Sequence, residues 1–372
     1  MSNIKIVLVG GGTGGHFYPL IAIAEALNGH SLAPKLFYVG PEPYDTNALV
    51  STNIKFVSVP AGKRRKYRSI RNYIDAVVSL VGIFVALCKL YIMYPDVIMS
   101  KGGYTSIPVI IAGIFFRIPI IIHESDSKIG SANKMVLRFA RAVIVSYDEV
   151  IPLIHHPRVY QFGVPIRSIF FQDQTPDALE SFGIDERIPL ILVLGGSQGA
   201  ERINQLILDS LDELLPRYTI IHQTGIHNYT ICVQSADKLI TDPELRSRYH
   251  PIAFLDASQL NNAYHLAQLV VSRAGSNSIF EVALHGKPSI IIPIPEEISH
   301  DQRSNAYAYA RTGACVVMEE RNFSDNLLQV EIDRIINDAP LYKGMSNAAR
   351  SFGKSDAAKN IASLIIEIAE RH

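Results

Sequence analysis

The sequence predicts an α/β protein with two doubly wound parallel sheets in tandem. Three observations support this prediction. An aliphatic run leads into a glycine-rich loop near the N-terminus, a second run does the same near the middle, and short aliphatic runs alternate with helical stretches around both. At 372 residues, the chain is long enough for two domains of ordinary size.

The first domain opens on the aliphatic run 4–9, which enters the glycine-rich loop 10–15 and then a helical segment. Strand, tight turn and helix in this order are typical of a Rossmann-like domain. Glycines allow close approach of a ligand, and a helix N-terminus favours an anion, so the loop is predicted to hold phosphate. A dinucleotide is disfavoured because the second strand, 35–39, ends in Gly40-Pro41 and not in an acidic residue that could hold a ribose.

The strand–loop–helix pattern restarts after Pro165. Further strands of the first domain are expected at 56–59, 97–99, 118–122 and 142–145. The second domain has strand 190–194, glycine loop 195–199, and strands at 219–222, 269–272, 289–292 and 314–318. The predicted division is 1–163, 164–345, and C-terminal helices over 346–372 that could pack back on the first domain. Ligands bind at the carboxyl ends of such strands, so the domains could face one another across a cleft. This is the GT-B glycosyltransferase plan, which some epimerases share.

Composition and sequence patterns argue against several functional classes of protein. The 35 basic and 35 acidic residues leave no global field for nucleic acid, so none is expected as a partner. Three widely spaced cysteines fit no zinc or redox spacing and suit a reduced cytoplasmic chain. Run 4–9 is short and enters a glycine turn, unlike a signal peptide. The chain contains no Asp-x-Asp stretch, the usual ligand pattern for a metal-bound diphosphate, so we expect no obligatory metal and no cofactor.

Five motifs in order resemble the MurG family. They are GGTGGH at 11–16, GGY at 102–104, IHE at 122–124, GGSQGA at 195–200 and SRAG at 272–275. The similarity runs from about residue 4 to about residue 318. It implies transfer of N-acetylglucosamine from UDP-N-acetylglucosamine to lipid I, which makes lipid II in peptidoglycan synthesis. The alternatives are a related GT-B enzyme with another lipid or sugar acceptor, a UDP-N-acetylglucosamine epimerase, and a binding protein.

A donor site is predicted where strand 269–272 meets the helix that opens at Gly275, because that N-terminus suits a diphosphate. Glu281 could accept both ribose hydroxyls, as the matching family glutamate does; alternatively, it is a solvated residue favoured by the helix dipole. The resemblance assigns Ser197 to the diphosphate, Phe254 and Leu255 to the uracil, and Gln302 to the sugar hydroxyls. The helix N-terminus contributes Gly275, Ser276, Asn277 and Ser278.

His16, at the mouth of the first helix, is the candidate general base for an inverting attack by the acceptor hydroxyl; alternatively, it caps the turn. The acceptor-side residues implied are Thr13, Gly14, Gly15, Gly103, Tyr104, Glu124, Asp126 and Arg167. Three positions depart from the family pattern. Asp126 and Val164 replace asparagines, and Lys101 precedes the glycine pair. Acceptor details are therefore expected to differ.

Membrane contact is predicted from the basic run 63–68 and the uncharged apolar segment 76–88 that follows it. About 13 residues fall short of the roughly 20 that span a bilayer. The segment is either a buried helix of the first domain or part of a peripheral surface on the anionic inner leaflet, at the cytoplasmic face of the cell membrane. The sequence leaves both interpretations open.

Overall fold

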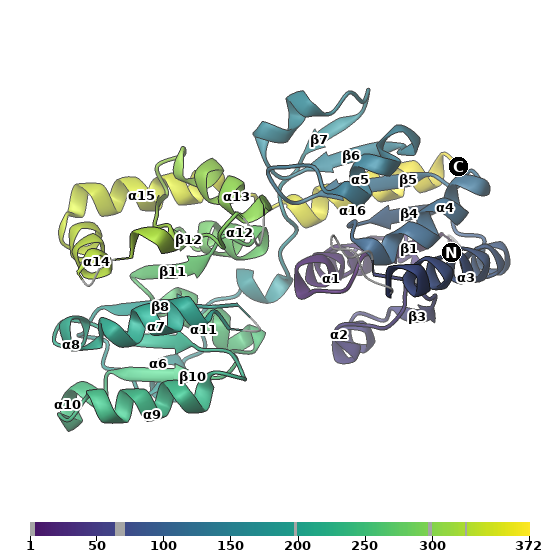
Figure 1. Ribbon diagram of the computed structural model, residues 1–372. Coiled ribbons are helices and arrows are strands. Elements are labelled where there is room, and N and C mark those ends of the chain that lie inside the picture. The colour runs from purple at the N-terminus through teal and green to yellow at the C-terminus, as the bar shows by residue number, and fades with distance from the viewer. Residues whose placement is uncertain (1–3, 64–70, 197–198, 297–299, 324–325) are drawn as a thin grey trace. The chain divides into compact units, whose positions relative to one another are not determined.

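The chain forms two compact units (Figure 1). The computed structural model describes residues 4–63, 71–196, 199–296, 300–323 and 326–372. Unit 1 comprises Met1–Ser168 and Lys354–His372, and unit 2 comprises Ile169–Gly353. The chain therefore divides after Ser168 and after Gly353, whereas the sequence placed the divisions after 163 and after 345.

Unit 1 is a parallel sheet with strand order β3-β2-β1-β4-β5-β6-β7 over the described residues. Its strands are β1 Lys5–Val9, β2 Lys35–Gly40, β3 Lys55–Ser58, β4 Val97–Ser100, β5 Ile120–Glu124, β6 Ala142–Val145 and β7 Val159–Gln161. Its helices are α1 Gly14–Asn28, α2 Thr46–Ser51, α3 Arg71–Met93, α4 Ile107–Phe115, α5 Ser131–Val136 and α16 Ala357–Glu370.

Alternating residues of β1 separate the two faces of this sheet. Ile6 and Leu8 pack into a core with α1 and α16, whereas Val7 and Val9 pack into a second core with α3 and α4. Figure 1 shows the C-terminal helix α16, in yellow, among the blue elements of unit 1. The unit is a three-layer sandwich, with helices on both faces of a sheet whose strands are apolar on both sides.

Unit 2 repeats the order as β10-β9-β8-β11-β12-β13 in the part of the chain that is described. Its strands are β8 Leu190–Leu194, β9 Thr219–Gln223, β10 Tyr249–Ile252, β11 Leu269–Arg273, β12 Ser289–Ile292 and β13 Cys315–Val317. Its helices are α6 Ala178–Phe182, α7 Glu201–Asp209, α8 Leu211–Leu214, α9 Tyr229–Leu239, α10 Pro243–Arg246, α11 Ala257–Leu266, α12 Ser276–Leu284, α13 His300–Ala310, α14 Leu327–Asn337 and α15 Ala339–Phe352. The two Rossmann-like domains of the predicted GT-B plan are confirmed.

Helix α3 is longer and more exposed than the apolar segment 76–88 suggested. It runs from Arg71 to Met93, and the most apolar 18-residue window of its stretch Tyr73–Met93 has mean hydropathy 2.3 and is only 17% buried. By length and composition it is the one helix among the described residues that could cross a membrane. The buried-helix interpretation is wrong for most of its surface. Residues 64–68 of the basic run lie outside the described residues.

Candidate active site

Both glycine-rich loops lie where the strand order of their sheet reverses. In unit 1 the loop 10–15 follows β1, and residues 101–103 follow the neighbouring strand β4. The two segments touch, since the Lys101 amide donates to the Val9 carbonyl at 2.8 Å and a Cβ on Gly103 would lie 3.3 Å from Cδ2 of His16. Open α/β sheets bind ligands in the crevice at such a switch point.

The backbone of the first loop requires glycine, and hydrogen bonds from neighbouring residues fix its conformation. Gly12 has φ +90° and Gly103 has φ +79°, in the left-handed region that favours glycine. The Tyr38 hydroxyl donates to the Gly10 carbonyl at 3.0 Å. The carbonyl of Thr13, the N-cap of α1, accepts the His16 amide at 3.2 Å. The helix N-terminus is thereby presented at the crevice, where an anion is favoured.

His16 is a neutral imidazole in this environment. Burial, followed by the charge of Lys101, lowers the pKa of His16 to about 4. The ring makes a hydrogen bond with the Lys101 backbone, whereas its Nδ1 atom is buried and has no partner among the described residues. Because a backbone carbonyl only accepts, the bonded ring nitrogen carries the proton and Nδ1 keeps its lone pair. A general base needs a ring nitrogen with a lone pair, and this tautomer supplies one at Nδ1. The ring also has a structural role, because its hydrogen bond links the two loops, so the catalytic role of His16 stays a prediction.

Lys101 is the residue that the sequence analysis left out of the site. It is 1% exposed, and its Nζ has no hydrogen-bond partner in the described part of the chain. The charges of Asp126 and Glu124 act on this ammonium and favour its protonated form, although burial lowers the pKa of Lys101 overall. Its place beside a glycine pair at a strand end was the signal that could have identified it. A buried ammonium without a hydrogen bond favours a site for an anion.

Glu124 is engaged within its own loop. The buried carboxylate accepts the Gly130 amide at 2.8 Å, the Asn133 side-chain amide at 2.9 Å and the Asp126 amide at 3.2 Å. Burial, followed by the charge of Asp126, raises the pKa of Glu124. These bonds close residues 124–133 into a compact turn that holds Asp126 near His16 and Lys101, because the charge of Asp126 acts on both.

The remaining acceptor-side residues lie on the same edge of unit 1. The Tyr104 ring lies against Gly12, where a Cβ would come within 3.0 Å of its Cε1. The Arg167 guanidinium stacks over the Tyr18 ring of α1 at 4.2 Å from the centroid. Gly14 and Gly15 form the first turn of α1. Val164, which replaces a family asparagine, is buried at 1% exposure and offers no polar group to a ligand.

The predicted donor site of unit 2 is centred on the N-terminus of α12. Gly275 is its N-cap and lies just beyond β11, the strand next to β8. Glycine has no side chain to cap the helix, so the first turn of Ser276, Asn277 and Ser278 suits an anion. The Asn305 side chain is fully buried and donates to the Ala274 carbonyl at 3.3 Å and to Ser276 Oγ at 3.2 Å.

The other predicted donor-side residues differ in burial and in hydrogen bonding. Glu281 is half-buried on α12, and the hydroxyl of buried Tyr264 donates to its Oε2 at 3.3 Å. Phe254 is 47% exposed, whereas Leu255 is buried and its amide donates to the Gln223 side chain. The Gln302 side chain, on α13, accepts a hydrogen bond at 3.4 Å from the amide of Ile294, which lies in the loop that follows β12. Ser197 lies outside the described residues.

No metal site is built into the described chain. Among the residues that the structure describes, no group of three or more His, Cys, Asp or Glu side chains could hold a metal ion.

Family models and solved structures were compared with this chain. The glycosyltransferase family 28 N-terminal domain matches residues 6–145, and the C-terminal domain of that family matches residues 190–361. The structure resembles the crystal structure of Acinetobacter baumannii MurG, with TM-score 0.77 and 22% identity over 98% of this chain and 99% of that one. It also resembles a Neisseria meningitidis UDP-GlcNAc 2-epimerase bound to UDP-GlcNAc, with TM-score 0.70 and 13% identity over 98% of this chain and 100% of that one. Both likenesses show the GT-B fold alone.

Sequence relatives decide the family. Two are named UDP-N-acetylglucosamine–N-acetylmuramyl-(pentapeptide) pyrophosphoryl-undecaprenol N-acetylglucosamine transferase. The protein from Thermodesulfovibrio yellowstonii is 33% identical over 99% of this chain and 98% of its own. The protein from Treponema pallidum is 33% identical over 96% of this chain and 94% of its own. The chain therefore belongs to glycosyltransferase family 28 and, within it, to the MurG family of glycosyltransferases.

Proposed function

We propose that this chain transfers N-acetylglucosamine from UDP-N-acetylglucosamine to the muramoyl sugar of lipid I, with inversion, and so forms lipid II for peptidoglycan synthesis. The observation that carries the proposal is 33% identity over 99% of the chain to a relative whose name states this transfer. The switch-point site of unit 1 supports it, because a neutral histidine and a buried ammonium lie there beside a glycine-rich loop.

In this proposal His16 takes the proton of the acceptor hydroxyl as that oxygen attacks the anomeric carbon. Its neutral form supports the role, since a protonated ring could not accept. Lys101 and the N-terminus of α1 face the negatively charged diphosphate of lipid I, and Thr13, Gly14, Gly15, Gly103, Tyr104, Glu124, Asp126 and Arg167 form the surrounding surface. An acceptor anion beside Lys101 would offset its charge and raise the pKa of His16, which makes the ring a stronger base once the acceptor is bound.

On the donor side, the N-terminus of α12 stabilises the UDP leaving group through backbone N–H groups. Gly275, Ser276, Asn277, Ser278 and Ser197 are assigned to the diphosphate, Glu281 to the ribose, Phe254 and Leu255 to the uracil, and Gln302 to the sugar. The exposure of Phe254 supports its assignment, because a base needs an accessible apolar face on which to stack.

The enzyme is placed at the cytoplasmic face of the cell membrane as a peripheral protein. Exposed apolar side chains on α3 support this, among them Leu80 at 67%, Val77 at 60% and Phe84 at 68% exposure. A row of this kind at a helix surface is typical of an interfacial helix. The lipid tail of the acceptor would then stay in the bilayer while its sugar reaches the site.

Acceptor dependence tests the reaction. The protein is incubated with UDP-N-acetylglucosamine, with and without a water-soluble lipid I analogue, and UDP and disaccharide are measured. The proposal expects UDP release and disaccharide only when the acceptor is present. The epimerase, which the fold also allows, would instead give free sugar and UDP or a new UDP-sugar without acceptor. A binding protein would turn over nothing.

A further inference from the structure

Tyr44 is an exposed aromatic residue at the switch-point crevice of unit 1. It lies in the turn between β2 and α2, and it is 45% exposed. Its ring borders the first turn of α1, because a Cβ on Gly14 would come within 3.3 Å of Tyr44 Cε1. An aromatic ring that is open to solvent beside a helix N-terminus favours contact with an apolar part of a ligand whose anion binds there.

Neighbouring residues hold the Tyr44 ring in place. It contacts the Tyr18 ring edge-on at a centroid distance of 5.7 Å and the Phe17 ring at 6.0 Å. The next residue, Asp45, caps α2 by accepting the Ala48 amide at 3.1 Å, and it also accepts the Tyr18 hydroxyl at 3.4 Å. A ring that is already positioned in this way loses little conformational freedom when a ligand packs against it.

The strand order places different residues on the two sides of the α1 N-terminus. β1 lies between β2 and β4, so Tyr44 follows the strand on one side, whereas Lys101 and Tyr104 follow the strand on the other. His16 contacts the β4 side, since a Cβ on Gly103 would lie 3.3 Å from its Cδ2. A ligand whose anion binds at this N-terminus therefore has the proposed base on one side and an exposed aromatic ring on the other.

We infer that Tyr44 packs against the first isoprene units of the acceptor, next to its diphosphate. This inference rests on the transfer proposed above, in which the acceptor hydroxyl reaches His16 and the diphosphate lies at the N-terminus of α1. In a pyrophosphoryl-undecaprenol acceptor the diphosphate joins the sugar to the lipid, so a sugar on the β4 side directs the lipid to the β2 side. There the Arg167 guanidinium, 4.2 Å from the centre of the Tyr18 ring, places positive charge beside Tyr44. Isoprene units are apolar and suit the open face of an aromatic ring.

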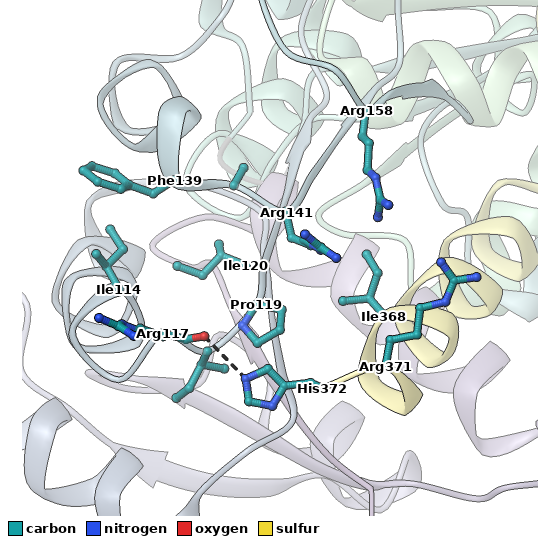
Figure 2. Close-up of a pocket in the computed structure, with 12 residues that line it drawn as sticks. Ile114, Arg117, Pro119, Ile120, Phe139, Arg141, Arg158, Ile368, Arg371 and His372 are labelled. Atoms are coloured by element: carbon teal, nitrogen blue, oxygen red, sulfur yellow. Dashed lines mark hydrogen bonds between the residues drawn. The ribbon is translucent and has the colours of Figure 1, made fainter.

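The opposite edge of the same sheet carries a basic pocket of about 440 Å³ (Figure 2). Arg141, Arg158 and Arg371 line it, beside the starts of β6 and β7 and the end of α16. Because parallel strands have their amino and carboxyl ends at opposite edges of a sheet, this pocket is separate from His16 and Tyr44. An acceptor diphosphate held there could not bring its sugar to the proposed base, so the contact with the lipid is assigned to the crevice beside Tyr44.

Two soluble acceptor analogues that differ only in the group on the diphosphate test this contact. One carries a methyl group, the other carries a chain of two isoprene units, and neither needs a membrane. kcat/KM for disaccharide formation is measured for the parent, Tyr44→Ser, Tyr44→Phe and the control Tyr94→Ser. Tyr94 is 64% exposed and precedes β4, at the amino-terminal edge of the sheet. Melting temperatures report folding, and the ratio of the two kcat/KM values within each variant is independent of the amount of folded enzyme.

The parent should prefer the isoprene analogue, and Tyr44→Ser should reduce this preference about tenfold, as expected when one ring face no longer covers the chain. Tyr44→Phe and Tyr94→Ser should keep the preference. An equal loss with both analogues would assign Tyr44 to the sugar or to packing and would overturn the inference. No loss with either analogue, or a parent without a preference, would overturn it too and leave the proposed transfer intact. A parent that turns over neither analogue overturns the proposed transfer as well.

Discussion

The pH dependence of turnover gives the sharpest test of the proposed base. The pKa of His16 is lowered to about 4, so the free enzyme should keep its base unprotonated down to that range. The acid limb of kcat/KM, which reports the free enzyme, should therefore lie near pH 4 and well below the ordinary histidine value of about 6.5. The acid limb of kcat should lie higher, because the bound acceptor diphosphate offsets Lys101.

Replacing Lys101 with Met perturbs this base without a large change of volume. The lysine charge is the second cause of the lowered pKa after burial, and Asp126, which raises it, remains in place. The pKa of His16 should therefore rise, and the acid limb of kcat/KM should move upward by about one unit, equivalent to about 1.4 kcal/mol. Burial alone should still keep the limb below that of a solvated histidine.

The assay is acceptor-dependent UDP release at limiting acceptor, from about pH 3 to pH 8, paired with NMR titration of the His16 ring. Lys287→Met is the matched control, because it removes a half-buried lysine of unit 2 whose pKa is also lowered by burial. Its profile should match the parent. A parent limb near the value of free histidine, or a Lys101→Met profile that does not move, would refute the electrostatic account of this site.

Three further predictions concern the donor site, the membrane surface and acid stability. Glu281→Ala should weaken UDP binding by about 1.5 to 3 kcal/mol in calorimetry, as for a hydrogen bond to a charged group; unchanged affinity would remove Glu281 from the site. Leu80→Ser with Phe84→Ser should reduce binding to neutral vesicles, since each exposed apolar side chain can contribute about 1.5 to 3 kcal/mol on burial, while activity on a soluble acceptor persists. Burial lowers the pKa of His222 to about 3 and of His285 to about 4, so the unfolded chain binds more protons below pH 6.5 and stability should fall as pH drops. The expected loss in urea unfolding is on the order of 2 kcal/mol per histidine between about pH 6.5 and pH 5, and a flat profile would contradict it.

Strands buried on both faces were predictable from the sequence, whereas of the four edge strands in the described sheets only β3 and β13 were predicted. The central runs at β1, β6, β8 and β12 are continuous aliphatic segments, and their expected bounds match the structure closely. The edge strands β7 and β10 were missed. β7 has only three residues and β10 contains Pro251, which removes a ladder donor and is tolerated at an edge.

The sequence predicted the glycine-rich backbone of the candidate site, but it did not predict all of the charged residues there. Glycine runs mark a turn because few residues can replace glycine at positive φ, so both loops were found. The burial of Lys101 was not foreseen, because lysine is almost always exposed and only the fold reveals what encloses it. Two of the three bonds accepted by Glu124 likewise come from Gly130 and Asn133, which a turn brings back to it from six and nine residues later in the chain.

Helix α16 affects the order in which the two units can fold during synthesis. Its side chains Ile361, Leu364, Ile365 and Ile368 are at most 5% exposed in the same core as α1. Burying four such aliphatic groups contributes roughly 6 to 12 kcal/mol, which is comparable to the whole stability of a domain. During synthesis the first unit therefore waits for α16 to leave the ribosome, whereas unit 2, continuous in sequence, can fold earlier. A nascent chain cut off near residue 353 would leave the face of α1 uncovered and prone to aggregate.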